Sequence, residues 1–170
     1  MFLGIFPAGF QNRLIKQRFN LKIYFKMIYS DTVRYALLAL TYLASNRHRL
    51  VKTDEIAKVQ NIPRPFLSKI LHELAKKDIL QSVKGPKGGF TLKVEPEKLT
   101  MWDVVSIMGE DYKFKTCVLM PDKCEEFATN PCVIHHRWES LKKSIVEFLK
   151  GTTIADLVSV EERHRAGLLS

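Results

Sequence analysis

Residues 53–94 constrain the fold of this chain more than any other stretch of its sequence. Thr53 is a residue type that caps helices, and the two acids after it suit the positive end of a helix. Gln60-Asn61-Ile62 breaks this first helix, and Pro63-Arg64-Pro65 begins a second one, because proline is tolerated in a first turn. Apolar residues at spacings of three and four give the second helix one buried stripe: Leu67, Ile70, Leu71 and Leu74. A short helix, a tight turn and a second helix predict a helix-turn-helix.

The other face of the second helix carries hydrogen-bond donors, and a hairpin is predicted beside it. The donors are Arg64, Ser68, Lys69, His72 and Lys76. Residues 79–84 read as a strand, and apolar residues alternate along residues 90–94 as a second strand. The loop between them, Gly85-Pro86-Lys87-Gly88-Gly89, can approach another molecule closely. This pattern predicts a β-hairpin wing with a basic tip; the competing interpretation is a small α+β core with a solvated hairpin.

Charge is divided unevenly along the 170 residues, whose formal net charge is +9. Residues 1–94 hold 17 lysines and arginines against 5 acids, a balance of +12. Residues 95–170 hold 10 against 13, a balance of −3. A basic excess in the half that contains the wing indicates a polyanionic partner, which we expect to be double-stranded DNA.

Other classes of protein are disfavoured. No apolar run approaches the length of a membrane span, so we expect no membrane partner. An odd number of cysteines, three, and no secretory signal of the usual order favour the cytoplasm over a disulfide framework. No nucleotide loop, catalytic triad or carboxylate pair stands in a recognisable setting, so we expect neither an enzyme nor a small-molecule substrate.

The remaining elements divide the chain into five expected segments. We expect a first helix from Ser30 or Asp31 to near Asn46, and a short helix that Thr100 opens through a capping box and Gly109 ends. The segments are an extension at 1–26, a winged helix-turn-helix domain at 27–94, a connecting helix and cysteine loop at 95–132, a long helix and a short last helix at 133–158, and a flexible tail at 159–170. We expect the extension to be either upstream translation before a natural start at Met27 or a disordered arm. A membrane-surface helix and a transit sequence are the alternatives for it.

The long helix is expected to join two copies of the chain. It runs through Lys150 and ends at Gly151, and spacings of three, four and three form an a/d seam of Trp138, Leu141, Ile145 and Phe148. A winged domain needs two copies to read a two-fold operator, so we expect a homodimer, with packing inside one chain as the alternative.

All three cysteines lie close together, at Cys117, Cys124 and Cys132. Thiolates bind soft metals and iron–sulfur clusters, and four ligands complete either site. Their spacing is loose for zinc and suits a loop around a cluster. The first histidine after them, His135, is the candidate fourth ligand. His136 is the competing ligand, although we expect its side chain to be solvated. Structural zinc and redox-exposed thiols without a metal are the alternatives.

These residues together resemble the winged helix-turn-helix regulators that include IscR, NsrR and CymR. The resemblance runs from Met27 to about Val158. It rests on Arg34-Tyr35-Ala36-Leu37, on the run from Ser82 to Phe90, on the three cysteines, and on Cys132-Val133-Ile134-His135 followed by Trp138.

The resemblance implies a homodimer with a long crossing helix and a cluster. IscR-like members hold a [2Fe–2S] cluster on three cysteines and a histidine, which here are Cys117, Cys124, Cys132 and His135. NsrR-like members use an aspartate of the partner's first helix; Arg34 stands at that position here, and Asp31 lies about one turn earlier. We therefore expect [2Fe–2S] in preference to [4Fe–4S], although cysteine spacings longer than those of IscR leave the cluster type open. CymR-like members carry no cluster and answer to a partner enzyme; the three cysteines argue against that here.

We expect a mainly helical, cytoplasmic transcriptional repressor whose operator binding is controlled by an iron–sulfur cluster that senses cluster status, redox state or nitric oxide. Six residues are expected to contact DNA. Four face the major groove, Arg64, Ser68, Lys69 and His72, with Ser68 and Lys69 as the base readers and Arg64 equally suited to phosphate. Lys84 and Lys87 of the wing enter or flank the minor groove. The alternatives are a regulator of the same fold with zinc or no cluster, controlled by thiol oxidation or a protein partner, and an iron–sulfur electron carrier.

Overall fold

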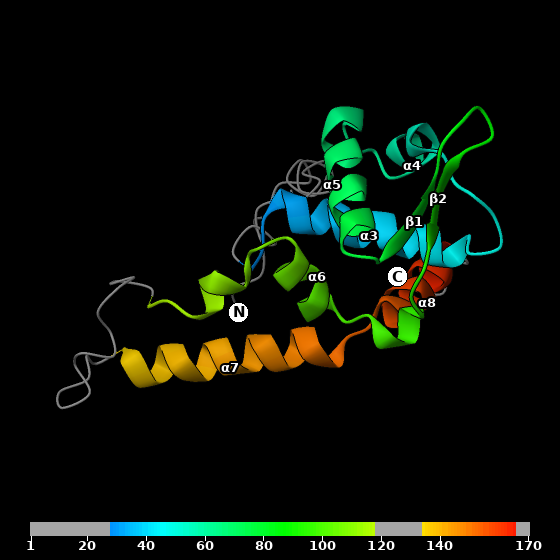
Figure 1. Cartoon of the computed structure of the whole chain (residues 1–170). Helices are drawn as coiled ribbons and strands as arrows, with labels where there is room; N and C mark the ends of the chain where they lie inside the picture. The colour runs from blue at the N-terminus through cyan, green and yellow to red at the C-terminus, as the bar shows by residue number, and fades with distance from the viewer. Residues whose placement is uncertain (1–27, 118–133, 166–170) are drawn as a thin grey trace, which may run out of the picture.

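The computed structural model describes residues 28–117 and 134–165 of the chain (Figure 1). The elements in order are α3 (Asp31–Ser45), α4 (Thr53–Val59), α5 (Arg64–Lys76), β1 (Leu80–Val83), β2 (Gly89–Leu92), η1 (Pro96–Lys98), α6 (Met101–Ile107), η2 (Asp111–Phe114), α7 (His135–Gly151) and α8 (Ile154–Arg165). None of the helices in these two ranges is long and apolar enough to cross a membrane. The predicted extension at 1–26 lies outside the described residues.

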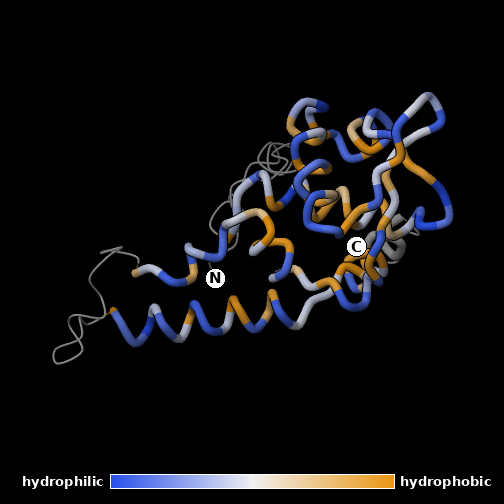
Figure 2. The backbone as a smooth tube through the Cα atoms, viewed as in Figure 1, coloured by the Kyte–Doolittle hydropathy of each residue, from blue (hydrophilic) through white to orange (hydrophobic). Residues whose placement is uncertain are grey.

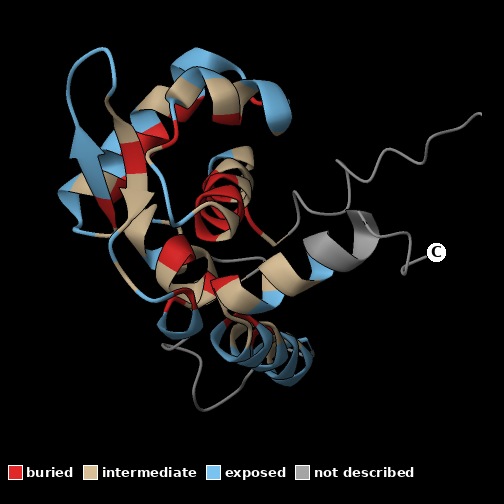
Figure 3. Cartoon of the chain, turned by 90° about the vertical axis from the view of Figure 1, so that its right-hand side faces the viewer, coloured by how far each residue is buried: buried red, intermediate tan, exposed pale blue. Residues whose placement is uncertain are grey.

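Helix α3 is the centre of the core. Of the two candidate caps, Ser30 and Asp31, Ser30 caps the helix by accepting hydrogen bonds from the backbone N–H groups of Thr32 and Val33. Nine of its fifteen residues are buried. Helices α5 and α8 pack against it, and Figure 3 shows the buried residues on the sides of the helices that face one another.

The turn between α4 and α5 follows the predicted pattern. Asn61 adopts a φ of 52°, which ends α4 sharply, and Pro65 lies in the first turn of α5. The prediction that Thr53 caps α4 was wrong, because Lys52 occupies the N-cap and Thr53 is the first helical residue. The backbone N–H and C=O of Val51 both bond to Phe90 of β2, and this pairing sets where the helix begins.

The predicted wing is an antiparallel hairpin of β1 and β2. Leu80 pairs with Leu92 and Val83 with Gly89, so both strands are shorter than the sequence pattern indicated. Gly88 approaches the backbone of β1 so closely that a Cβ atom there would lie 2.1 Å from the carbonyl oxygen of Val83. A side chain at this position is therefore incompatible with the turn.

The C-terminal part begins with the predicted capping box. Thr100 and Asp103 exchange both hydrogen bonds of the box at the start of α6, and Gly109, with a φ of 72°, follows the end of the helix. Thr153 and Asp156 form a similar exchange at the start of α8. Helix α8 continues to Arg165, seven residues beyond the predicted end at Val158, because it packs along α3 and its last turns contain good helix formers.

The described chain is thus mainly helical with a two-stranded hairpin, as the sequence predicted. Helix α7 runs beside α6 and away from the helices that pack around α3 (Figure 1). It includes Gly151, which we expected to end it, and Thr152 is its C-cap.

Candidate nucleic-acid interface and cysteine segment

Helix α5 presents the predicted donors on its outer face. Lys69 and His72 are exposed, and Ser68 is half-buried. Lys69 makes no ion pair with any residue that the structure describes. The guanidinium of Arg64 is exposed but already bonds the carboxylate of Asp54, in the first turn of α4. The sequence did not indicate this pair, which joins the two helices of the helix-turn-helix.

The hairpin continues the surface that α5 begins. The ring of His72 lies edge-on to that of Phe90 in β2, with 6.0 Å between their centroids. The hairpin projects beside α4 and α5 (Figure 1). Lys84 and Lys87 are exposed at its tip, and neither forms an ion pair within the described part of the chain. The structure therefore places all six predicted DNA contacts on α5 and the hairpin, which adjoin.

The acidic side chains of the helix-turn-helix and wing are neutralised locally. Every acid between residues 28 and 94 forms an ion pair with a lysine or arginine of the same region; the five pairs are Asp31–Arg34, Asp54–Arg64, Glu55–Arg49, Glu73–Lys76 and Asp78–Lys93. Hydrogen bonds from Arg49 and Tyr42 also lower the pKa of Glu55. No acid is left to offset Lys69, Lys84 and Lys87, so the outer surface is positive.

The structure describes only the two ends of the cysteine loop. Cys117 is partly exposed, and Cys124 and Cys132 lie outside the described residues. His135, half-buried, is the first residue of α7, and His136 next to it is exposed, as the sequence suggested. Among the described residues no three potential ligands gather into a metal site. The predicted site could not be found among them, because two of its four ligands are Cys124 and Cys132.

Trp138 links these two ends. Its indole Nε1 donates a hydrogen bond of 3.1 Å to the carbonyl oxygen of Thr116, the residue before Cys117. Trp138 lies three residues after His135, about one turn along α7. The chain before the loop is thereby held against the first turn of α7, where the loop returns.

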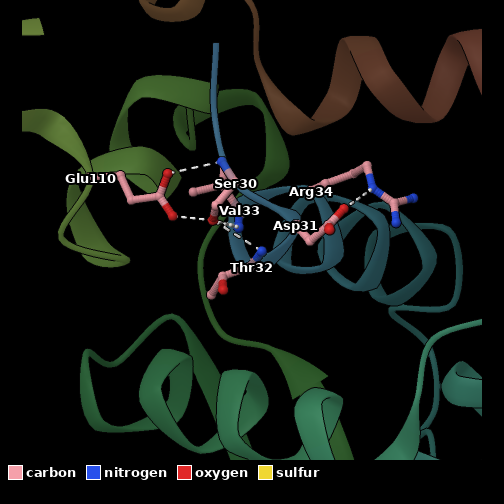
Figure 4. A network of polar contacts seen from close by, with 6 residues as sticks. All are labelled: Ser30, Asp31, Thr32, Val33, Arg34 and Glu110. Atoms are coloured by element: carbon pink, nitrogen blue, oxygen red, sulfur yellow. Dashed lines mark hydrogen bonds and ion pairs between the residues drawn. The ribbon is translucent and has the colours of Figure 1, made fainter. Parts of the chain in front are cut away.

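A second link, from Glu110, joins the segment before Cys117 to α3 (Figure 4). The Ser30 backbone N–H donates to one oxygen of Glu110 at 2.9 Å, and the Ser30 hydroxyl donates to the other. Lys113 donates to the same carboxylate at 2.7 Å. Burial acts to raise the pKa of Glu110, but the hydrogen bonds from Lys113 and Ser30 outweigh it and hold this pKa below its ordinary value of 4.5. Sequence reading missed Glu110, since its partner is 80 positions away.

Asp31, the alternative cluster ligand, lies at the start of α3. Its carboxylate accepts a hydrogen bond of 3.3 Å from Arg34 Nε, one turn later in the same helix (Figure 4). Arg34 also lies over the ring of Tyr35, with 4.6 Å from its Cζ atom to the ring centroid.

Helix α7 exposes an apolar face. Figure 2 shows apolar positions recurring along it. Of the four seam residues, Trp138 and Ile145 are half-buried against their own chain, whereas Leu141 and Phe148 are 51% and 57% exposed. Ile134, just before the helix, is also exposed. Ile134, Leu141 and Phe148 are seven residues apart and form the apolar stripe of α7.

Comparison with known proteins identifies relatives over most of the chain. The family model Rrf2, described as an iron-dependent transcriptional regulator, matches residues 29–160. A candidate HTH-type transcriptional regulator of Aquifex aeolicus is 62% identical over 138 residues, which cover 81% of this chain and 96% of that protein. IscR of Sodalis glossinidius is 30% identical over 130 residues, covering 76% of this chain and 77% of IscR.

Solved structures show the same architecture. The structure of T. potens IscR superposes with a TM-score of 0.62 and 27% identity, covering 79% of this chain and 88% of that one. CymR of B. subtilis, described as the global cysteine regulator, has a TM-score of 0.62 at 23% identity over 77% of this chain and 95% of CymR, a likeness of fold alone. The chain therefore belongs to the Rrf2 family of winged helix-turn-helix transcriptional regulators, the family of IscR, NsrR and CymR, whose members are regulators and not enzymes.

Proposed function

We propose that this regulator binds operator DNA as a homodimer through α5 and the wing, as a cytoplasmic repressor controlled by an iron–sulfur cluster. The observation that carries the DNA contact is the charge pattern of the domain. Its acids are paired within the domain, while Lys69, Lys84 and Lys87 are exposed on adjoining elements without ion pairs in the described chain. Unpaired cations on one surface favour a phosphate backbone.

The six predicted contacts then divide by position. Ser68 and Lys69 read base edges in the major groove, with His72 beside the wing. Arg64 bonds phosphate, and Asp54 orients its guanidinium from α4. Lys84 and Lys87 lie along or in the minor groove and supply affinity rather than discrimination.

Competitive gel-shift assays test these roles on a duplex that the wild-type protein selects from a random-sequence library. Lys69→Ala should lose discrimination between that duplex and random DNA by about 5- to 150-fold, the range for a base contact of 1–3 kcal/mol. Lys84→Ala should weaken binding to both duplexes and reduce the steepness of the salt dependence. Lys143→Ala, an exposed lysine of α7, is the control. If neither Lys69→Ala nor Lys84→Ala changes binding, the interface is misassigned.

Dimerisation is proposed through the apolar stripe of α7. Ile134, Leu141 and Phe148 repeat every seven residues, the interval at which a helix meets a partner helix. Two copies would place two α5 helices against one duplex, as a two-fold operator requires.

We further propose that Cys117, Cys124, Cys132 and His135 hold the cluster, [2Fe–2S] in preference to [4Fe–4S]. The donor set is three thiolates and one imidazole, which suits iron. The Trp138–Thr116 hydrogen bond supports the assignment, because it keeps Cys117 near the turn that carries His135. When bound, the cluster supplies a group whose oxidation, loss or reaction with nitric oxide changes its ligands.

The chain itself offers a route from this loop to the DNA-binding helices. Residues 110–113 lead into Cys117 through η2, and Glu110 holds the N-terminus of α3. A change in the loop is thus passed to α3, against which α5 packs. In this proposal Glu110 and Ser30 position the helix and are not ligands of the cluster.

Anaerobic purification followed by an absorption spectrum and by iron, sulfide and zinc analysis tests the cluster. Cys117→Ser and His135→Ala should abolish or shift the visible absorbance, whereas His136→Ala, the adjacent exposed histidine, should leave it unchanged. Colour that survives Cys117→Ser would refute the ligand set. Zinc without iron would instead support the regulator with a structural metal.

A further inference from the structure

Phe66, in the first turn of α5, is exposed where its surroundings give no structural reason. Its exposed fraction is 61%, the largest among the large hydrophobic side chains of residues 28–117 and 134–165. Leaving such a ring largely in water forfeits the favourable free energy that its burial would contribute. The core side of α5 is already filled by the four residues of its buried stripe, beginning with Leu67.

The position of Phe66 places it on the proposed DNA surface. It is turned about 100° around the helix from Leu67, which faces the core. Lys69 follows it by three residues, so the two side chains are neighbours on the outside of α5. The N-terminal residues of the second helix are the ones that reach base edges in a helix-turn-helix. Phe66 therefore lies where the helix approaches the floor of the major groove.

The chemistry of the major groove restricts what such a ring can contact. Base edges there present hydrogen-bond donors and acceptors, which a phenyl ring cannot satisfy, and one apolar group, the C5-methyl of thymine. We propose that Phe66 contacts a thymine methyl in each half-site and so contributes base discrimination next to Lys69. This inference rests on the proposed function, and it adds a specificity residue that the hydrogen-bond donors of α5 do not include.

Methyl deletion in the DNA tests the contact directly. In the duplex selected by the wild-type protein, each thymine is replaced in turn by uracil, which lacks only the C5-methyl. One position in each half-site should weaken wild-type binding by about fourfold, the worth of one buried methyl group of about 0.8 kcal/mol. At that position 5-bromouracil, whose bromine is similar in size to a methyl group, should restore binding.

Variants of the protein complete the cycle. Phe66→Ala should bind the thymine duplex more weakly and become insensitive to uracil at that one position, and Phe66→Leu should keep part of the sensitivity. Val160→Ala, which removes another exposed apolar side chain, on α8, should behave as wild type. Circular dichroism checks that Phe66→Ala keeps its helices, as an exposed position predicts.

The outcomes separate this inference from the proposed function. If wild type selects a duplex but Phe66→Ala retains the full uracil sensitivity, or no thymine is sensitive in wild type, the methyl contact is refuted and DNA binding stands. If wild type selects no duplex at all, the proposed function fails and the inference fails with it.

Discussion

Helices α3 and α7 have similar lengths and opposite surroundings. Nine of fifteen residues are buried in α3, whereas only Lys142 and Leu149 are buried among the seventeen of α7. Helix α3 is packed by α5, α8, α6 and β2, while α7 packs mainly on α6 (Figure 3). The stability of α3 thus comes from its own chain, whereas α7 carries an apolar stripe that no described residue of its own chain covers. One helix supports the fold, and the other is available for assembly.

The largest expected effect is the loss of stability when the buried face of α3 is truncated. Leu40 is fully buried, so Leu40→Ala should lower the free energy of unfolding by about 3–5 kcal/mol, the lost transfer energy plus a cavity. Urea unfolding followed by circular dichroism measures it. Leu141→Ala on α7 makes the same chemical change at an exposed site, and its smaller loss should depend on protein concentration if the stripe joins two chains. If the two variants lose equal unfolding free energy and neither loss depends on protein concentration, the contrast between α3 and α7 is contradicted.

The next effect concerns the stripe of α7. Phe148→Asp places a charge in the proposed contact and should raise the dimer dissociation constant by about 100-fold, or roughly 2–3 kcal/mol. Sedimentation velocity over a range of concentrations measures this constant. Glu147→Ala, the exposed neighbour, should leave it near the wild-type value. A dimer that survives Phe148→Asp would place the contact elsewhere.

A smaller effect tests the link between the two regions. Glu110→Gln should cost about 1–2 kcal/mol at neutral pH, because it removes charge-assisted hydrogen bonds from Lys113 and Ser30. The folded-state pKa of Glu110 is lowered, so its carboxylate stabilises the fold above pH 4.5, and this contribution is lost as the pH falls through the lowered pKa. Unfolding free energies measured from pH 7 down to acid should therefore fall less in Glu110→Gln than in wild type.

The control for that experiment is Glu97→Gln. Glu97 is an exposed carboxylate of η1 that forms no ion pair with the described residues. This variant should follow the wild-type pH dependence of stability. If Glu110→Gln follows it as well, the carboxylate of Glu110 does not hold α3.

The smallest expected effect concerns the end of the cysteine loop. Trp138→Phe removes the indole N–H that bonds Thr116, an interaction worth about 1 kcal/mol. In metal-free protein with Cys124 and Cys132 changed to serine, Cys117 should then react about fivefold faster with a thiol reagent. Trp102→Phe, whose indole bonds no described residue, should leave the rate unchanged. An unchanged rate in Trp138→Phe would show that the hydrogen bond does not restrain Cys117.

The same contrast explains which features could be read from the sequence. Helix α3 with Ser30 among its two candidate caps, the capping box at Thr100 and the hairpin were predicted, since each depends on residues within a few positions of one another. The seam of α7 was predicted in part. Periodicity identified its apolar residues, but it could not tell that Trp138 and Ile145 turn toward their own chain while Leu141 and Phe148 face outward.

Sequence alone determined the mainly helical class with a wing, the basic half of the chain and the residue types available for DNA and metal, because periodicity, caps and charge are local properties. Tertiary structure decided which charges are neutralised, as in Arg64–Asp54, and which distant segments are joined, as in Glu110–Ser30 and Trp138–Thr116. It also decided that Thr53 is the first residue of α4 and that Lys52 occupies the N-cap, next to the pairing of Val51 with Phe90. These features depend on contacts between residues far apart in the chain, whose distances are set only when the core packs.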